Sequence, residues 1–187
     1  SYAVVWSDTR TNSRCIYLQS CDSTGNQLLP YEGINIKTGI SGNAQNHQLV
    51  ENGDNPIVLW EDGRNTWHQK QIYMQILNSE AEMTFETNGI PITIDTGNSQ
   101  ENFDAVYNTA DDIICVVWEE NRSIDNKIYA QAIDTTGNRQ WADEGIRLSF
   151  DDESYGYSAK IDFSDEFYFA GWSDYESFSD YKIMGQG

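Results

Sequence analysis

The segment 115–131, CVVWEENRSIDNKIYAQ, decides the fold because its pattern occurs four times along the chain. An apolar run leads to Trp118, an acidic residue follows at Glu120, and Arg122 stands two residues further on. A second apolar segment then ends in Gln131. The tryptophans that anchor the four copies are Trp6, Trp60, Trp118 and Trp172, at intervals of about 55 residues.

The arginine of this pattern occurs in three copies, as Arg10, Arg64 and Arg122, whereas the fourth copy has Glu176 at this place. Because the three arginines hold the same position in the repeat, we expect them to share a structural role and not to form a substrate-binding cluster. The expected role is an ion pair with the preceding acid, or hydrogen bonds to loop carbonyls.

Each copy continues with a strand that ends in glutamine. These glutamines are Gln19, Gln75, Gln131 and Gln186. A turn follows, as in Asp22–Asn26, where the aspartate bonds backbone amides and Gly25 accepts a positive φ. A short strand then begins with Gly-Ile, and a further strand is expected near residues 47–51, 104–108 and 159–163.

These patterns predict an all-β chain without sustained helical periodicity. The expected fold is a β-propeller-like array of four-stranded antiparallel blades, with about 3.5 repeats of about 55 residues. We predict a single repeat domain over residues 1–187, with approximate repeats 1–45, 46–100, 101–156 and an incomplete 157–187. Stacking of the units is expected because the run before each tryptophan is apolar on both faces, which one sheet alone cannot bury.

The combined pattern W-[SE]-[DE]-x-R, I-Y-x-Q-x-x-D-x-x-G-N and G-I resembles a repeat that is common in exported bacterial surface proteins with C-terminal sorting domains. The resemblance covers essentially the whole chain. It implies β-propeller blades and an extracellular or cell-surface location, and it implies no particular activity, because propellers host many functions.

The chain starts and stops within a predicted blade, since a first strand is missing before Trp6 and a last strand after Gln186. Open strand edges invite pairing with other strands. Three explanations remain open: further blades in a longer chain, self-association of several chains into a ring, or end-to-end stacking.

The net charge argues against two classes of binding partner. The 187 residues carry 30 acidic and 11 basic side chains, for a net charge of −19. Such a field repels nucleic acids and anionic membrane surfaces. No apolar run approaches the roughly 18–20 residues that a membrane-spanning helix needs.

The sequence predicts no metal centre and no disulfide framework. Cys15, Cys21 and Cys115 are odd in number, and the first two are expected along one strand, too far apart for a bridge. Calcium is the one cofactor left open, because acidic loops such as Asp111–Asp112 and Asp151–Glu153 suit a hard cation.

Aromatic residues outside the repeat are the candidate ligand contacts. Trp67 and His68 lie in an insertion, and Tyr155 and Tyr157 lie in a tyrosine-rich segment. Aromatic side chains with a polar group suit both sugar stacking and protein contact.

The leading interpretation is a non-catalytic module with a structural or adhesive role, self-assembling through its incomplete terminal blades into a filament. No acid stands outside the repeat in a distinctive setting, so no catalytic residue is predicted and the chain is not expected to be an enzyme. The first alternative is a carbohydrate-binding, lectin-like module, and the second is a glycoside-processing enzyme.

Overall fold

The structure is a computed structural model. It describes the chain except residues 39–41, 54, 67–68, 95–96, 123–124, 151–153, 165–166 and 178–179. The side chains of residues 66, 176–177 and 180–181 are likewise not described.

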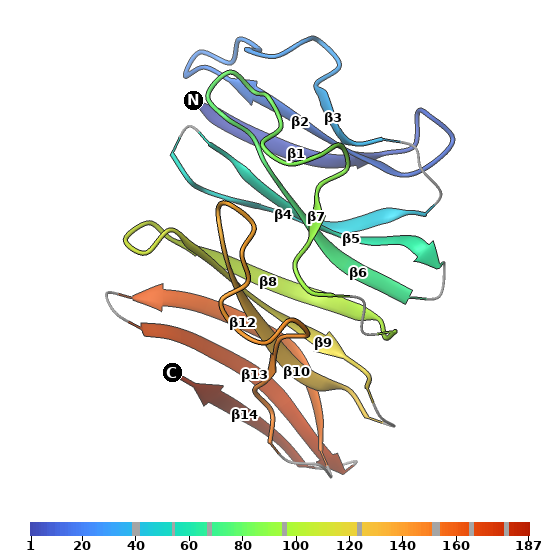
Figure 1. The fold of residues 1–187 in the computed structure, drawn as a ribbon, viewed down its shortest axis with the longest axis vertical. Coiled ribbons are helices and arrows are strands. Elements are labelled where there is room, and N and C mark those ends of the chain that lie inside the picture. Colours follow the sequence, from blue (N-terminus) through green and yellow to red (C-terminus); the bar gives the residue numbers. More distant parts are fainter. Residues whose placement is uncertain are drawn as a thin grey trace. The chain divides into compact units, whose positions relative to one another are not determined.

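The described residues form four antiparallel sheets (Figure 1). The first contains β1 (Tyr2–Asp8), β2 (Cys15–Cys21) and β3 (Ile34–Lys37). The second contains β4 (Ala44–Val50), β5 (Ile57–Thr66), β6 (Gln69–Ile76) and β7 (Ile90–Pro91). The third contains β8 (Gln100–Asn108), β9 (Ile113–Glu120), β10 (Lys127–Asp134) and β11 (Ile146–Arg147). The fourth contains β12 (Tyr155–Ser164), β13 (Phe167–Ser177) and β14 (Asp180–Gln186).

The prediction of an all-β chain built from antiparallel sheets is confirmed. Within each sheet, the strands lie side by side in the order in which they follow along the chain. The sheets hold three, four, four and three strands, which agrees with the prediction of four strands per repeat with one strand missing at each end. The described part of the chain contains no helix, and therefore none that is long and apolar enough to cross a membrane. Cys15 and Cys21 lie at the two ends of β2, and all three cysteines are unpaired.

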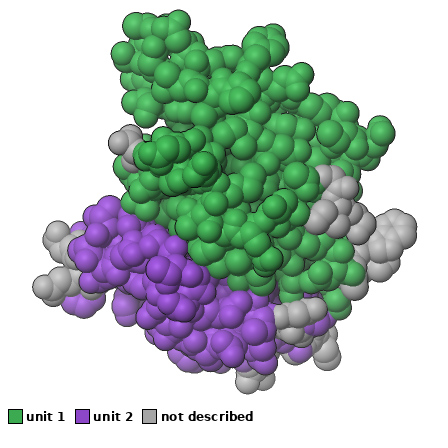
Figure 2. Space-filling model, turned by 45° about the horizontal axis from the view of Figure 1, so that its top comes forward, with its two compact units in different colours: residues 1–91 green, residues 92–187 purple. Residues whose placement is uncertain are grey.

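The contacts divide the chain into two compact units, Ser1–Pro91 and Ile92–Gly187, which Figure 2 shows in two colours. Each unit contains two of the four sheets.

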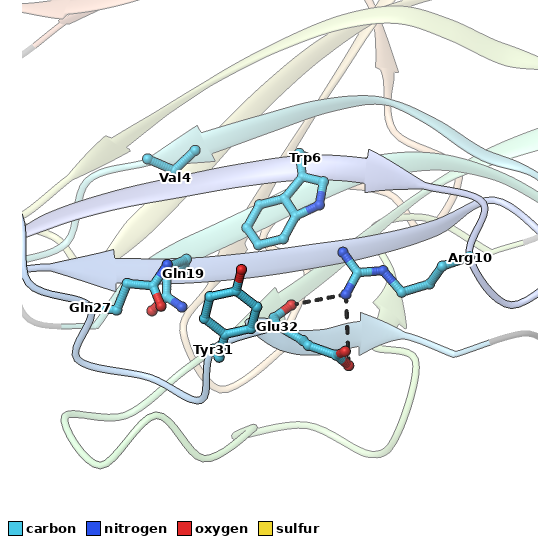
Figure 3. A pocket seen from close by; sticks show the side chains of 7 residues that line it. All are labelled: Val4, Trp6, Arg10, Gln19, Gln27, Tyr31 and Glu32. Atoms are coloured by element: carbon cyan, nitrogen blue, oxygen red, sulfur yellow. Dashed lines mark hydrogen bonds and ion pairs between the residues drawn. The ribbon is translucent and has the colours of Figure 1, made fainter.

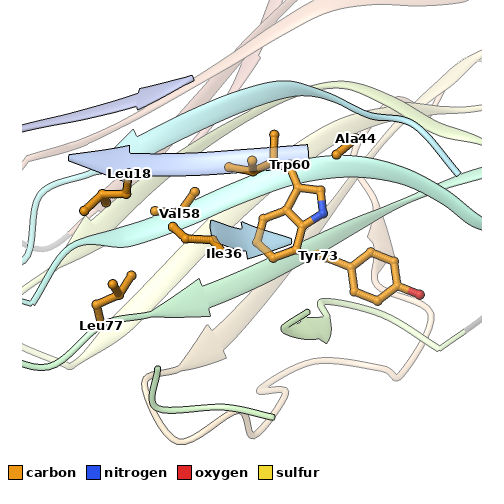
Figure 4. Packing of buried hydrophobic residues seen from close by; sticks show 8 residues of the cluster. Leu18, Ile36, Ala44, Val58, Trp60, Tyr73 and Leu77 are labelled. Carbon is orange, nitrogen blue, oxygen red and sulfur yellow. The ribbon is translucent and has the colours of Figure 1, made fainter. Parts of the chain in front are cut away.

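In the first unit, alternate residues of β2 point to opposite faces of the sheet, so that Ile16 and Leu18 share a face with Ile36 of β3. This aliphatic face packs on Val58 and Trp60 of the second sheet (Figure 4). Trp60 is completely buried as a result. Truncation of a tryptophan in such a core costs about 3–5 kcal/mol, so this contact is a large part of the stability of the unit.

The second unit repeats this arrangement with its own residues. Val117, Ile128 and Ala130 of the third sheet pack on Ala170 and Trp172 of the fourth. In both units, one sheet offers small or branched aliphatic side chains and the next sheet offers its tryptophan. The recurring tryptophan is therefore a sheet-packing residue.

One detail differs from the sequence interpretation, which placed each tryptophan at the end of its strand. The strands continue past it: β1 ends at Asp8, β5 at Thr66 and β9 at Glu120. Because side chains two residues apart on a strand share a face, the acid lies beside the tryptophan ring. The strands are therefore extended by polar residues, among which the acid is held in place by its hydrogen bonds and its ion pair.

A glycine precedes the last strand of the sheet and lets the chain approach the tryptophan closely. Gly89 has a φ of +70°, and a Cβ there would lie 2.8 Å from the Trp60 ring and would collide with the Met74 carbonyl oxygen. Gly33 and Gly145 meet Trp6 and Trp118 in the same way. Any side chain at these positions must push the chain off the tryptophan.

We therefore expect Gly89→Ala to lower the free energy of unfolding by at least about 2 kcal/mol more than Gly25→Ala. Gly25 also has a positive φ, of +88°, but nothing lies within 4 Å of the place of its Cβ, so it controls for backbone strain alone. Urea unfolding of the two variants measures the difference. Equal losses of free energy of unfolding in the two variants would show that the collision with Trp60 and Met74 adds nothing to the cost of the substitution.

Candidate functional site

The repeated arginines form closed structural clusters. In the first unit, the Asp62 carboxylate accepts hydrogen bonds from Nε and Nη2 of Arg64, at 3.0 and 2.7 Å, and from Trp60 Nε1 at 3.1 Å. The guanidinium lies 3.7 Å above the ring centroid of Tyr73 and donates to the Asn88 carbonyl at 2.9 Å. Nε and Nη2 of Arg64 are thus bonded within the fold.

Arg10 and Arg122 repeat this geometry. Arg10 pairs with Asp8 and lies 4.3 Å above Tyr17, while Arg122 pairs with Glu120 and lies 4.0 Å above its own tyrosine, Tyr129. Three of the repeat glutamines tie the strand to the next turn by donating to the backbone carbonyls of Pro30, Glu86 and Ala142, as Gln19, Gln75 and Gln131 respectively. Gln186 lies exposed at the end of β14.

A hollow of about 470 Å³ lies on the first sheet, beside Trp6, Arg10, Gln19 and Tyr31 (Figure 3). The equivalent face of the second sheet, around Trp60, is covered by aliphatic side chains of the first. The hollow therefore corresponds to a sheet-packing face of the repeat, and Trp6, Arg10 and Gln19 beside it are structural residues of the repeat.

A second hollow, of about 290 Å³, lies in the second unit and is mostly apolar. Val117, Trp141, Leu148 and Phe167 contribute to its wall, with the Cys115 thiol. Burial raises the pKa of Cys115 to about 12, so the thiol stays protonated and is a poor nucleophile. This hollow offers packing surface and no reactive group.

The first strands of the second, third and fourth sheets share a different feature, a β-bulge. The pairing shifts between Gln45 and Gln48, between Glu101 and Asp104, and between Tyr157 and Lys160. The bulged backbone has a positive φ at Asn46, Asn102 and Ser158, which is unusual for residues other than glycine. Such bulges redirect side chains and occur often beside active sites.

The bulge of β8 gathers carboxylates on one face of the third sheet. Glu101 pairs with Glu119 of β9, and Asp104 pairs with Val117, two residues before Glu119. Directly opposed residues share a face, so the extra residue in β8 brings Glu101 and Asp104 to the same side as Glu119. Ser99 donates a hydrogen bond of 2.7 Å to Glu101.

Asp104 links β8 to β12. Its carboxylate accepts a hydrogen bond of 3.1 Å from the backbone N–H of Ile161 and lies 3.6 Å from Nζ of Lys160. The Asp104 side chain is 16% exposed and that of Lys160 is 75% exposed, so this pair sits at the solvent edge of the unit.

The tyrosine-rich segment lies on the same strand, β12. The rings of Tyr155 and Tyr157 are parallel within 5°, with centroids 6.3 Å apart, and Tyr175 of β13 lies 6.1 Å from Tyr155. Gly156 faces the other way and allows β12 to pack closely on Ile128 of β10. The sequence Tyr-Gly-Tyr thus combines close sheet packing with two aromatic rings on the opposite face.

Negative charge surrounds these tyrosines. The hydrogen bond of Tyr155 to Asp125 raises the pKa of Tyr155. Burial, followed by the charges of Glu119 and Asp125, raises the pKa of Tyr157. Both phenols therefore remain protonated hydrogen-bond donors at neutral pH, and Tyr157 is 37% exposed to receive a ligand.

Of the sequence-predicted ligand contacts, the structure brings Tyr155 and Tyr157 together. Trp67 and His68 lie outside the described residues, as does the acidic loop Asp151–Glu153. Among the residues that are described, no group of three or more His, Cys, Asp or Glu could hold a metal ion. Calcium binding stays a prediction.

Sequence reasoning missed the carboxylates of β8. Glu101 and Asp104 occupy positions that hold Gln45 and Gln48 in the previous repeat, so they do stand outside the repeat pattern. The expectation that no acid had a distinctive setting is corrected here. An alignment of the segments that form β4, β8 and β12 would have shown these substitutions, but the bulge that brings the acids together has no clear sequence signal.

Comparison with known proteins finds a similar fold in solved structures of carbohydrate-processing enzymes. No protein-family model and no curated protein matches the sequence. Among solved structures, an N-acetylgalactosamine deacetylase from F. plautii, in complex with blood group B trisaccharide, is similar with a TM-score of 0.60 at 9% identity. The match covers 99% of this chain and 62% of that enzyme, so the chain spans about three fifths of its length.

Two further structures are similar over almost the whole chain. An α-L-arabinanase from Penicillium chrysogenum, complexed with arabinobiose, has a TM-score of 0.54 at 12% identity, covering 95% of this chain and 57% of that one. An endo-arabinase from Bacteroides thetaiotaomicron has a TM-score of 0.52 at 14% identity, covering 99% and 70%.

These matches contradict the leading interpretation from the sequence, a non-catalytic structural or adhesive module that assembles through its terminal blades. The three similar solved structures are carbohydrate-processing enzymes. The prediction that the chain is not an enzyme is wrong on the same ground. The physical reason for the error is that the repeat records only the shared scaffold, whereas function depends on the residues that differ between copies.

The repeated acid–arginine pair makes a prediction about pH. The hydrogen bonds of Arg10 lower the pKa of Asp8 from 3.8 to about 2, so its stabilising effect is complete above pH 4 and is lost as the pH falls towards 2. We expect Arg10→Ala to return the pKa of Asp8 towards 3.8 in an NMR titration of the carboxyl carbons. The pKa of Asp22, which hydrogen bonds from Asn26 and Thr24 lower, serves as the internal control and should not move. A low pKa of Asp8 in the variant would contradict this assignment.

Proposed function

We propose that this chain is a propeller part of a glycoside-processing enzyme, and that its glycan site lies on β8 and β12 of the second unit. The observation that carries the proposal is the joint presence of Glu101, Asp104 and Tyr157 at the two bulges. These positions differ from copy to copy, so the shared fold does not explain them, unlike the arginines and tryptophans.

The carboxylates supply the chemistry that glycoside cleavage requires. Most glycoside hydrolases use two carboxyl groups, one to protonate the leaving oxygen and one to activate water or attack the sugar. Glu101 and Asp104 share a face of the third sheet and are the pair we assign to these roles. Asp104 accepts the Ile161 N–H and lies beside Lys160, and we assign it as the candidate base or nucleophile, with Glu101 as the candidate acid.

The tyrosines supply the binding surface. An exposed aromatic ring packs on the apolar face of a sugar while its hydroxyl donates a hydrogen bond. Tyr157 lies next to the bulge of β12, and Tyr155 and Tyr175 extend the aromatic surface along the same face.

The similar structures support a glycan as the substrate, since they are named with arabinobiose and with blood group B trisaccharide. We accordingly propose an oligosaccharide substrate and, in line with the sequence resemblance, an extracellular or cell-surface location. The four sheets are proposed as blades of a propeller in which this chain is one part.

A second candidate function, glycan binding without turnover, is favoured by the tyrosine cluster, because three aromatic rings gather there whether or not Glu101 and Asp104 react. The two functions differ in what removal of a carboxylate does. Binding depends on the rings, and hydrolysis depends also on the acids.

The test measures release of reducing sugar from arabinan and from a panel of chromogenic glycosides. We expect turnover that falls at least about 100-fold in Glu101→Gln and in Asp104→Asn. Glu80→Gln, in an exposed turn of the first unit, is the control and should keep full activity. Binding of arabinobiose without turnover of any substrate would favour the second function, and neither binding nor turnover would overturn the proposed site.

A further inference from the structure

Glu119 of β9 is a buried carboxylate that lies next to the proposed glycan site but has no assigned role in it. Its side chain is only 5% exposed. No lysine or arginine of the described residues lies within 4.0 Å of its oxygens, and within that part of the chain they accept two hydrogen bonds. Burial of a carboxyl group without a neighbouring cation is costly, so what these two hydrogen bonds hold in place is of interest.

The two hydrogen bonds of Glu119 reach the two bulges of the site. Oε1 accepts the backbone N–H of Ser158 at 2.8 Å, and Oε2 accepts Nδ2 of Asn102 at 3.1 Å. Ser158 and Asn102 are the residues with positive φ, of 55° and 52°, in β12 and β8. One carboxylate therefore contacts the strained residue of both strands.

Each of these strained residues directly follows a proposed site residue. Asn102 follows Glu101, and Ser158 follows Tyr157. Positive φ in such residues costs about 1–3 kcal/mol and persists only where neighbouring groups enforce it. The bond to the Ser158 N–H enforces the bulge of β12, and the bond to Asn102 enforces that of β8.

We propose that Glu119 is a positioning residue that holds the bulges of β8 and β12 together and thereby sets the place of Glu101 relative to Tyr157. It acts through these neighbours and does not touch the substrate. The effect on glycan turnover rests on the proposed function, whereas the hold on the two bulges does not.

The preceding repeat contains a natural comparison, Glu61 of β5. Glu61 is fully buried and accepts Nδ2 of Asn46, the positive-φ residue of β4, at 2.8 Å. Nζ of Lys70 lies 3.2 Å from Glu61 and balances its charge. Glu61 thus supports a bulge in the first unit, whereas Tyr155 and Tyr157 belong to the second, and Glu61 is a matched control for loss of a buried carboxylate.

The experiment compares Glu119→Ala, Glu119→Gln and Glu61→Ala in the full chain. Alanine removes both bonds, so we expect hydrogen exchange of the Ser158 amide to rise at least about 10-fold in Glu119→Ala. Glutamine keeps an acceptor for Ser158 and, after rotation of the Asn102 amide, a partner for that residue, and should restore slow exchange. Glu61→Ala should leave the Ser158 amide protected.

The charge of Glu119 gives a second readout that a merely structural role would not move. Both Glu119 variants should lower the pKa of Tyr157, whereas Glu61→Ala should not. An ultraviolet titration measures this shift, with Tyr157→Phe to assign the signal. Should Glu119→Ala fail to fold, Glu119→Gln still tests the charge and Asn102→Ala tests the bond to β8 through the amide exchange of residues 101–104.

On the glycan substrate, Glu119→Ala should lower kcat/KM at least about 10-fold, with recovery in Glu119→Gln. Unchanged Ser158 exchange and an unchanged Tyr157 titration in Glu119→Ala would overturn the positioning role. Faster Ser158 exchange in a protein without glycan activity would support the hold on the bulges and count against the proposed function instead.

Discussion

The fold depends on the burial of a tryptophan between two sheets. Each sheet has two apolar faces and can hide them only against a neighbour. Within the first unit, Trp60 is buried by the aliphatic face of the first sheet, and within the second unit, Trp172 is buried by the third. Beside Trp60, Asp62 serves this packing, because it accepts the indole N–H and is itself paired with Arg64, which is stacked on Tyr73. Bonding of these polar groups is the condition under which they can be buried at low cost. The fourth copy has no such arginine, and Trp172 Nε1 and Asp174 Oδ1 are buried without a hydrogen-bond partner among the described residues.

Because the tryptophan packing occupies the repeated residues, the proposed site is formed by residues that do not repeat. The tryptophans, arginines and glutamines recur because every sheet has the same packing problem. The residues at the bulges need not recur. The bulges lie in β4, β8 and β12, which are edge strands of their sheets and do not contain the repeated tryptophan. Gln45, Glu101 and Tyr157 hold equivalent places, and only the second unit combines acids with aromatic rings there. A chain built from repeats can thus acquire a site by changing edge positions while its core stays constant.

The sequence predicts the scaffold well for the same reason. Four copies of one pattern give four sheets, and the order of strands follows from short antiparallel connections. The tyrosines at 155 and 157 could be selected because they fall outside the pattern. The acids could not, because Glu101 and Asp104 are three residues apart and would face opposite sides of a regular strand. Only the extra residue of the bulge brings them to one face, and a single inserted residue leaves almost no trace in an alternating pattern. The contact of Glu119 with Ser158 joins residues that are 39 positions apart in the sequence, so no local pattern indicates it.

The central claim is that the edge strands β8 and β12 form a glycan site. Chemical-shift mapping of backbone amides during titration with arabinobiose and longer arabinan fragments tests it most directly. The account predicts that the largest shifts fall on residues 99–105 and 155–161. Shifts confined to the face around Trp6 and Tyr31, or no shifts with any oligosaccharide, would contradict it.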